Sequence, residues 1–358
     1  MTNDVETTSG RSKHGTQLQI ESFVDPIESG RTKGASKSYD PNYEKLIEKL
    51  NARNLAIAEK NKGQPPSSEP PSSGAVTRSR KNSTEIVLQD TFPLWDDDLR
   101  GVPNPFVRSG LFSVRNSETR AFVPKMKVDS LANYDLRYSG MELQQSDLSV
   151  WMFLINLLRQ KKMTDSVHFT GYSLIKDLGW RMHSESYKRA KESIERLKLT
   201  SLEILSPELD KCYAGSLIRE YAWQSVDAQD GEEKWMVTFE PKISVLFLED
   251  TTTLLEWETR KLIGSRAHVA LWLHSFYSSH RDPIPLAVSK IHEICRSGDS
   301  LRSFKRNVKT ALQRLIEVGF LADFHIDGDD VLHVKKLPRA ARLAAAKQLK
   351  IKSSAKKK

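Results

Sequence analysis

The spacing of hydrophobic residues predicts two successive series of helices and strands. Apolar residues at intervals of three and four indicate helices, and short β-branched or alternating runs indicate strands. Two strands, Val107–Arg115 and Tyr138–Leu143, are expected before the first series. The first series is expected to contain three helices, which are Asp147–Gln160 (capped by Ser146), a helix from Thr170 to before Gly179, and Glu185–Lys198. Its strands are expected at Val167–Phe169, Ser201–Leu205, Leu217–Trp223 and Lys234–Phe239.

A second series follows in the same order. It is expected to contain the helix Arg266–His280, a helix from Pro285-Leu286 to Ser297-Gly298, the helix Leu301–Val318 capped by Asp299 or Ser300 and ended by Gly319, and the strands Phe320–His325 and Val331–Val334 joined across Asp327-Gly328. A helix, a short helix, a long helix and a hairpin form the winged variety of helix-turn-helix.

The fold class predicted from this repetition is α+β, with two tandem winged-helix domains. Domain 1 is placed at residues 86–250 and domain 2 at 251–338. Residues 1–85 are rich in Ser, Thr, Lys and Glu and are predicted to be a largely disordered arm. Within the arm, Pro41–Lys60 has the spacing of a short amphipathic helix, which could dock on its own domain or on a partner.

The positive charge of the chain is concentrated at its C-terminal end. Ten of the 55 Lys and Arg residues lie in Lys335–Lys358, which has no Asp or Glu, so the 334 residues before it hold 45 basic and 46 acidic side chains. Residues 339–358 are therefore predicted to be a basic tail, helical at Ala340–Gln348 and mobile at Lys352–Lys358. Such a tail could simply keep the protein soluble, or it could add sequence-independent contacts to DNA phosphates.

Several classes of protein are disfavoured by what the sequence lacks. No apolar run reaches 18 residues, and Met1–Gly10 does not have the pattern of a secretory signal. Cys212 and Cys295 are too few for a metal site or a disulfide framework. We therefore expect a cytoplasmic protein with reduced thiols, with no membrane segment and no metal.

Catalytic motifs are also missing. No Gly is followed by Lys, which excludes a P-loop, and neither a His-x-His pair nor the H-E-x-x-H and G-x-S-x-G motifs occur. The sequence therefore predicts a protein that is not an enzyme and needs no cofactor.

The helix Leu301–Val318 is the strongest candidate for contact with DNA. One face is apolar, and the opposite face contains cations with no acidic residue between them. Because protein surfaces usually mix charges of both signs, this face favours DNA binding over an ordinary solvated surface. The candidate contacts on it are Arg302, Lys305, Arg306, Lys309 and Gln313.

The corresponding helix of the first series is a weaker candidate. Lys188, Arg189 and Arg196 face away from its apolar stripe, but Glu192 and Glu195 lie among them. DNA contact and an ordinary exposed face remain equally open there. The loops Asp227–Glu233 and Asp327–Asp330 are acidic, so neither wing tip is expected to lie on phosphates.

Several collinear strings resemble the TrfA family of plasmid replication initiators. The resemblance extends from about Trp95 to Lys336. The strings are Ser278-Ser279-His280-Arg281-Asp282-Pro283-Ile284-Pro285-Leu286, Leu111-Phe112-Ser113-Val114-Arg115-Asn116, Tyr138-Ser139-Gly140-Met141-Glu142-Leu143 and Asp177-Leu178-Gly179-Trp180.

The resemblance implies two winged-helix domains that bind directly repeated origin sequences called iterons. It also implies opening of the origin DNA, recruitment of the host replicative helicase and initiator, control of plasmid copy number, and dimerisation through domain 1. Members also contact the sliding clamp, but Leu88-Gln89-Asp90-Thr91-Phe92 matches the clamp-binding string poorly.

A winged-helix transcriptional repressor that binds an operator is the alternative function. Repressors usually recognise a palindrome as symmetric dimers, whereas two unlike domains in one chain suit a long asymmetric site. The sequence therefore favours the initiator.

Overall fold

The computed structural model describes residues 91–355, except 94, 118, 132–134, 163, 207–210, 225–232 and 248–250. The helix predicted at Pro41–Lys60, most of the acidic loop Asp227–Glu233 and the last three lysines lie outside the described residues.

The first half of the described chain repeats the element order that the second half uses. Its helices are α3 (Gln145–Leu158), α4 (Gly171–Leu178) and α5 (Ser184–Lys198), and its strands are β6 (Ser166–Thr170), β9 (Glu220–Gln224) and β10 (Lys234–Thr238). The three strands form an antiparallel sheet of order β6-β10-β9. The strand after the first helix therefore pairs with the last strand of the series.

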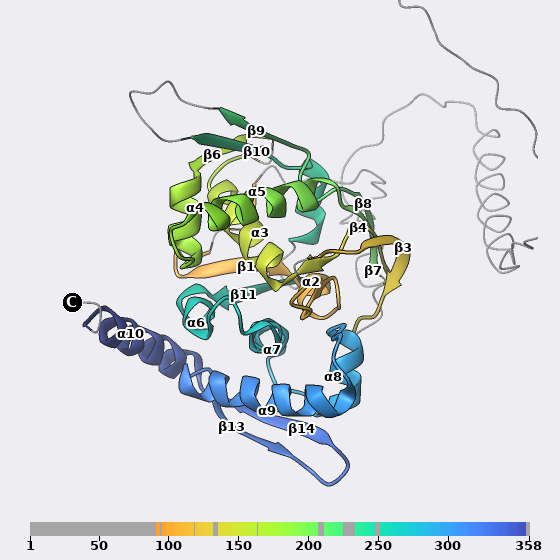
Figure 1. Ribbon diagram of the computed structural model, residues 1–358, viewed down its shortest axis with the longest axis vertical. Coiled ribbons are helices and arrows are strands. Elements are labelled where there is room, and N and C mark those ends of the chain that lie inside the picture. The colour runs from red at the N-terminus through yellow and green to blue at the C-terminus, as the bar shows by residue number, and fades with distance from the viewer. Residues whose placement is uncertain are drawn as a thin grey trace, which may run out of the picture. The chain divides into compact units, whose positions relative to one another are not determined.

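The second half has the same topology. Its elements are α7 (His268–Ser278), β12 (Leu286–Ala287), α8 (Val288–Ile294), α9 (Leu301–Glu317), β13 (Leu321–Ile326) and β14 (Val331–Lys336). The sheet order is β12-β14-β13, so the last strand again lies between the first two strands of the series. Figure 1 shows α9 between α7 and the β13–β14 hairpin. The mixture of helices and antiparallel strands confirms the predicted α+β class.

The first half carries additional strands and one short helix. These are β1 (Leu99–Pro103), α2 (Asn104–Val107), β2 (Phe112–Ser113), β3 (Phe122–Val128), β4 (Asp135–Met141), β5 (Leu143–Gln144), β7 (Ser201–Ser206) and β8 (Lys211–Gly215). A four-stranded sheet of order β3-β4-β7-β8 contains the hairpin inserted after α5. The short strand β2 pairs in parallel with β5.

Three further elements link the two halves. They are the 3-10 helix η1 (Pro241–Leu246), the strand β11 (Thr252–Glu256), which pairs with β1, and the helix α6 (Trp257–Ile263). The last element, α10 (Arg339–Ala355), packs on α6.

Local capping signals explain several helix boundaries. The Thr170 side chain accepts a hydrogen bond from the Ser173 amide, and Ser300 does the same for Ser303. Gly179 and Gly319 end α4 and α9 with φ angles of 67° and 73°, which glycine adopts without strain. These four predictions are confirmed. The expected cap at Ser146 is wrong, because α3 begins at Gln145, two residues before the predicted start, and its N-cap is Gln144.

The buried residues form two clusters. The larger belongs to the first half and contains the aromatic stack of Trp151, Phe106 and Phe247. The smaller surrounds α7, α8 and α9, and it also takes in Val114 from the first half.

Hydrogen bonds fix the two halves against each other. The indole of Trp272 donates to the Ser109 carbonyl at 3.1 Å. Arg260 is fully enclosed and donates to Gln145, Ser149 and Ser275, so it joins α6 to both α3 and α7. Burial lowers the pKa of Arg260 to about 9, which leaves it charged at neutral pH.

Other boundaries differ from the sequence prediction. In place of a strand at Val107–Arg115, α2 ends at Val107 and the strand is confined to Phe112–Ser113. Leu286 belongs to β12, and α8 starts at Val288. Strands β1, β3 and β8 and the helix α6 were not predicted.

The C-terminal segment differs most from expectation. Lys352 was expected to be mobile, but α10 continues to Ala355. Arg342 forms an ion pair with the buried carboxylate of Glu256 at 2.6 Å, and Ala346 is 4% exposed. Most of the predicted tail is therefore a helix that packs on the protein.

Two further findings concern the described part of the chain. None of its helices has the length and apolar composition that a bilayer crossing requires. No three His, Cys, Asp or Glu side chains in it are placed to share a metal ion.

Candidate nucleic-acid interface

Helix α9 separates its apolar and cationic residues as the sequence predicts. The buried face packs against α7, α8 and β13 and consists of Phe304, Val308, Ala311, Leu312 and Leu315. Since this face fixes the rotation of the helix, the opposite face must point out of the core.

The outward face of α9 presents cations without anionic partners. Arg302, Arg306, Lys309 and Gln313 are exposed, and no ion pair of the first three is found in the described part of the chain. Glu317, the one acidic residue of α9, lies at its C-terminal end and pairs with Arg314 at 3.2 Å. The face therefore has a local excess of positive charge.

Lys305 differs from the other candidates because it contacts the turn of the hairpin. Its ammonium lies 2.5 Å from Asp330, a residue with a φ angle of 60°. Asp327 holds the same turn by accepting bonds from the Asp329 and Val331 amides. Lys305 thus neutralises part of the acidic turn and fixes it beside α9.

Helix α5 uses its cations in contacts within the protein. Arg196 is 12% exposed, and its guanidinium lies 3.0 Å from Asp147, which is fully buried. Arg189 stacks over the Trp180 ring at 4.3 Å. Lys188, at 67% exposure, has a weak contact with Glu192 at 4.0 Å. The three candidates on α5 are therefore not equivalent, and Lys188 alone among them is largely exposed.

Asp147 connects α5 to the start of α3. It accepts bonds from Arg196, Arg120, Ser193 and the Gln144 amide. Burial opposes ionisation of Asp147, but the two guanidinium groups and these hydrogen bonds lower its pKa below the usual range. The Arg196–Asp147 pair is a structural element of the first half.

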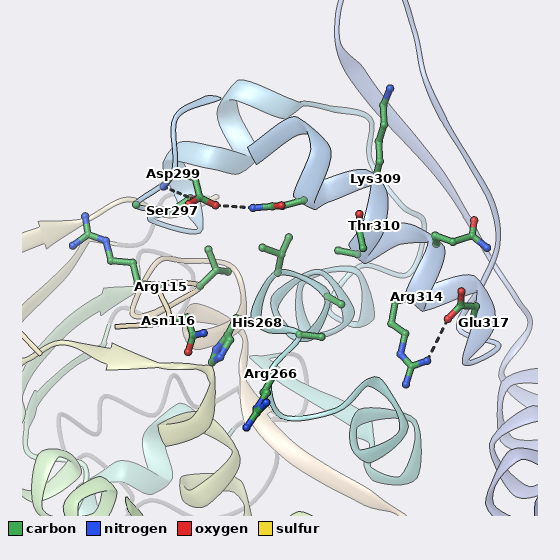
Figure 2. Close-up of a pocket in the computed structure, with 18 of the residues that line it drawn as sticks. Arg115, Asn116, Arg266, His268, Ser297, Asp299, Lys309, Thr310, Arg314 and Glu317 are labelled. Atoms are coloured by element: carbon green, nitrogen blue, oxygen red, sulfur yellow. Dashed lines mark hydrogen bonds and ion pairs between the residues drawn. The ribbon is translucent and has the colours of Figure 1, made fainter. Parts of the chain in front are cut away.

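A concave surface lies between α9 and the first half of the chain (Figure 2). The cavity has a volume of about 1300 Å³. It is lined by the segment 114–117, the N-terminal end of α7, the turn 297–299, α9 and Phe324. Lys309 and Gln313 line it together with two cations from outside α9, Arg115 and Arg266.

Sequence reasoning did not identify Arg115, Arg266 or His268 as candidates. They lie on a loop and at the start of a helix, so helical periodicity gives no sign of them. The string Leu111–Asn116, which carries part of the family resemblance, does contain Arg115. That overlap was the one available signal.

Comparison with known proteins places the chain in a family. The model of the family described as TrfA protein matches residues 74–336. The plasmid replication initiator protein TrfA of Escherichia coli is 27% identical over 264 residues, which are 73% of this chain and 67% of that protein.

Two solved structures also match. A selenomethionine form of domains 2 and 3 of RctB has a TM-score of 0.45 and 14% identity, and covers 66% of this chain and 98% of its own. A second structure of these domains has a TM-score of 0.44 and 13% identity, with coverage of 65% and 98%.

Since the family model spans well over half of the sequence, the chain belongs to the TrfA family.

Proposed function

We propose that this protein is a plasmid replication initiator that binds directly repeated origin sequences. The family to which it belongs and its E. coli relative support the initiator role. The observation that carries the DNA-binding part of the proposal is the cationic face of α9, where Arg302, Arg306 and Lys309 have no ion pair among the described residues.

Each half is proposed to act as a winged-helix domain. Both series contain a helix, a strand, two helices and two strands, with the sheet order first, third, second. In such domains the third helix enters the major groove, so α9 is the recognition helix of the second half. Arg302, Arg306, Lys309 and Gln313 would then reach phosphates and base edges.

The first half would contact DNA less directly. Lys188 is available on α5, whereas Arg196 is held by Asp147 and is left out of the proposed interface. Two domains with unequal contacts suit an asymmetric repeat, as found in directly repeated iterons.

The remaining roles are proposed from the family. Origin opening would use DNA-binding energy, without a catalytic group of this chain, and the host helicase and initiator would then be recruited. Self-association through the first half would use β3, an edge strand whose Phe122 is 66% exposed. A clamp contact is left out, because Phe92 is buried against Phe247 with ring centroids 4.5 Å apart.

The test is a mobility-shift titration on the plasmid's own DNA at fixed salt. We expect fragments that carry direct repeats beside an AT-rich tract to bind at least about 1000-fold more tightly than random DNA. Equal affinity for both DNAs would contradict the proposal. The same titration with palindromic operator-like fragments distinguishes the repressor.

A further inference from the structure

The N-terminal end of α7 opens into the cavity beside α9. Residues 266–270, which include the first turn of this 11-residue helix, line the cavity wall. The N-cap residue is Ala267, which provides no side-chain acceptor for the first amides. The positive end of the helix dipole and the first N–H groups of α7, which the N-cap side chain does not cap, therefore lie at the cavity.

His268 lies at this helix end, and one of its ring nitrogens lacks a hydrogen-bond partner among the described residues. Its side chain is 6% exposed, it lines the cavity, and its Nδ1 atom has no partner among the described residues. In Figure 2 the ring lies beside Asn116, across the cavity from Lys309 and Thr310. A buried imidazole that lacks a hydrogen-bond partner costs stability, and because His268 lines the cavity, we expect a ligand there to bond to the ring.

Guanidinium groups surround this end of α7. Arg266 precedes the N-cap residue Ala267 and is exposed. Behind the cavity wall, burial together with Arg189, Arg120 and Arg260 lowers the pKa of His268 to about 4. The imidazole is thus neutral at pH 7 and can still donate one N–H to an acceptor.

Carboxylates near the cavity are already engaged. Asp147, which also acts on His268, is bonded by Arg120 and Arg196. On the opposite side, Asp299 accepts from Asn307 at 2.7 Å and Glu317 pairs with Arg314. Arg266 itself has no ion-pair partner among the described residues, so its charge is left for an external anion to balance.

We propose that Arg266, His268, Asn116 and the first amides of α7 form a site for one backbone phosphate of bound DNA. The inference rests on the proposed DNA-binding function and deepens it. A helix N-terminus flanked by arginine is suited to a phosphate group. Lys309 and Gln313 of α9 line the other side of the same cavity. The site would fix the position of the strand that α9 contacts.

The test combines protein variants with chemically altered DNA. Arg266→Gln removes the exposed charge, and His268→Phe keeps a ring of similar size without nitrogen atoms. For each protein, affinity for the repeat is measured as a function of salt, and a single methylphosphonate is moved along the repeat to neutralise one phosphate at a time.

We expect Arg266→Gln to flatten the slope of log K against log salt by about 0.9, the value for one phosphate. One methylphosphonate position should weaken wild-type binding several-fold and have no effect on Arg266→Gln. His268→Phe should weaken binding by several-fold, with an unchanged or higher melting temperature, because an unpartnered polar group has been replaced by an apolar one. A merely structural histidine would lower that temperature.

The matched control is Arg281→Gln, which removes an exposed arginine beyond the other end of α7. The methylphosphonate that weakens DNA binding by wild type should weaken DNA binding by Arg281→Gln as well. The proposal is overturned if Arg266→Gln has the wild-type slope and the same methylphosphonate sensitivity while wild type still prefers the repeat. The proposed function itself fails only when wild type shows no such preference.

A free phosphate is distinguished from DNA by its effect on the protein alone. Inorganic phosphate should leave the melting temperature of wild type and Arg266→Gln equally unchanged. The result would be different if inorganic phosphate raised the melting temperature of wild type alone and no methylphosphonate position weakened DNA binding. The site would then take a free phosphoryl ligand, and the proposed DNA contact would be wrong.

Discussion

Helices α5 and α9 occupy equivalent places in the two halves, but they use their cations differently. On α5, Arg196 binds the buried Asp147 and Arg189 stacks on Trp180. On α9, Arg302, Arg306 and Lys309 have no ion-pair partner in the part of the chain that the structure describes. Equivalent positions in a repeated fold therefore do not imply equivalent functions.

The comparison gives a physical criterion for choosing candidate contacts. A cation that pairs with a buried carboxylate stabilises the fold. If it moved to contact DNA, it would leave the buried negative charge of the carboxylate without a partner, which is costly. A cation exposed to water can exchange its hydration for a phosphate or a base edge at a much smaller cost. By this criterion the principal contact lies on α9.

The largest effect is expected from charge reversal on α9. Arg306→Glu combined with Lys309→Glu should weaken binding to the repeat by about 4 kcal/mol, because contacts worth about 1–3 kcal/mol each become repulsive. Both side chains are exposed, so the unfolding free energy should change little. Titration at fixed salt measures the loss, and Lys188→Glu on α5 is the matched control with a smaller expected effect.

A second prediction concerns the equivalent helix. Arg196→Ala should lower the unfolding free energy by about 3 kcal/mol, since it leaves Asp147 with Arg120 as its one remaining ion-pair partner in the described structure. Urea unfolding measures this change. At a temperature where the variant is folded, its affinity for DNA should equal that of wild type. A stable variant with weakened DNA binding would place Arg196 in the interface after all.

Arg342 on α10, like Arg196 on α5, is a cation that pairs with a buried carboxylate, in this case that of Glu256. Burial alone would raise the pKa of Glu256, but His274 and the Arg342 guanidinium lower it to about 2. Because the folded pKa lies below the ordinary value of about 4.3, the ionised form stabilises the fold above that pH, and this contribution is lost as the pH falls towards 2.

The variant Arg342→Gln should therefore lose about 2 kcal/mol at pH 7 and show a smaller further loss between pH 4.5 and about 2. Urea unfolding as a function of pH measures both values. Lys347→Gln, an exposed change on α10, is the control and should match wild type. Parallel pH profiles for Arg342→Gln and wild type would contradict the structural role of this pair.

The smallest effect is expected at the turn beside α9. Asp330→Asn releases Lys305 and removes one negative charge from the hairpin tip. Affinity for all DNA sequences should rise by about 0.5 kcal/mol, the typical value of an exposed ion pair. Asp323→Asn on β13 is the control. A loss of affinity would mean that the acidic turn supports the interface.

The sequence predicted the elements whose signals are local. The stripe of Phe304, Val308 and Leu315 and the stops at Gly179 and Gly319 need no knowledge of distant residues, and these predictions are confirmed. Strand β1 was missed because its pairing partner β11 lies far along the chain. Strand β3 pairs with the neighbouring β4 but was missed because its buried and exposed residues do not alternate regularly. The docking of α10 depends on Glu256, which lies 86 residues before Arg342 in the sequence.

The candidate interface was predictable to a similar extent. Periodicity identifies the outward face of α9, whereas the burial of Arg196 follows from the position of Asp147 on another helix. The cavity that Arg266 and His268 line is formed by several segments that are far apart in the sequence. The spacing of residues along one helix does not predict which distant segments pack beside it.

Selection of DNA fragments by the wild-type protein and by the Arg306→Glu, Lys309→Glu variant tests the central claim most directly. Fragments of the whole plasmid are mixed with each protein, and the bound DNA is sequenced. We expect wild type to enrich fragments with direct repeats beside an AT-rich tract and the α9 variant to enrich none, while Lys188→Glu retains the wild-type pattern. Enrichment of the same repeats by the α9 variant would contradict it.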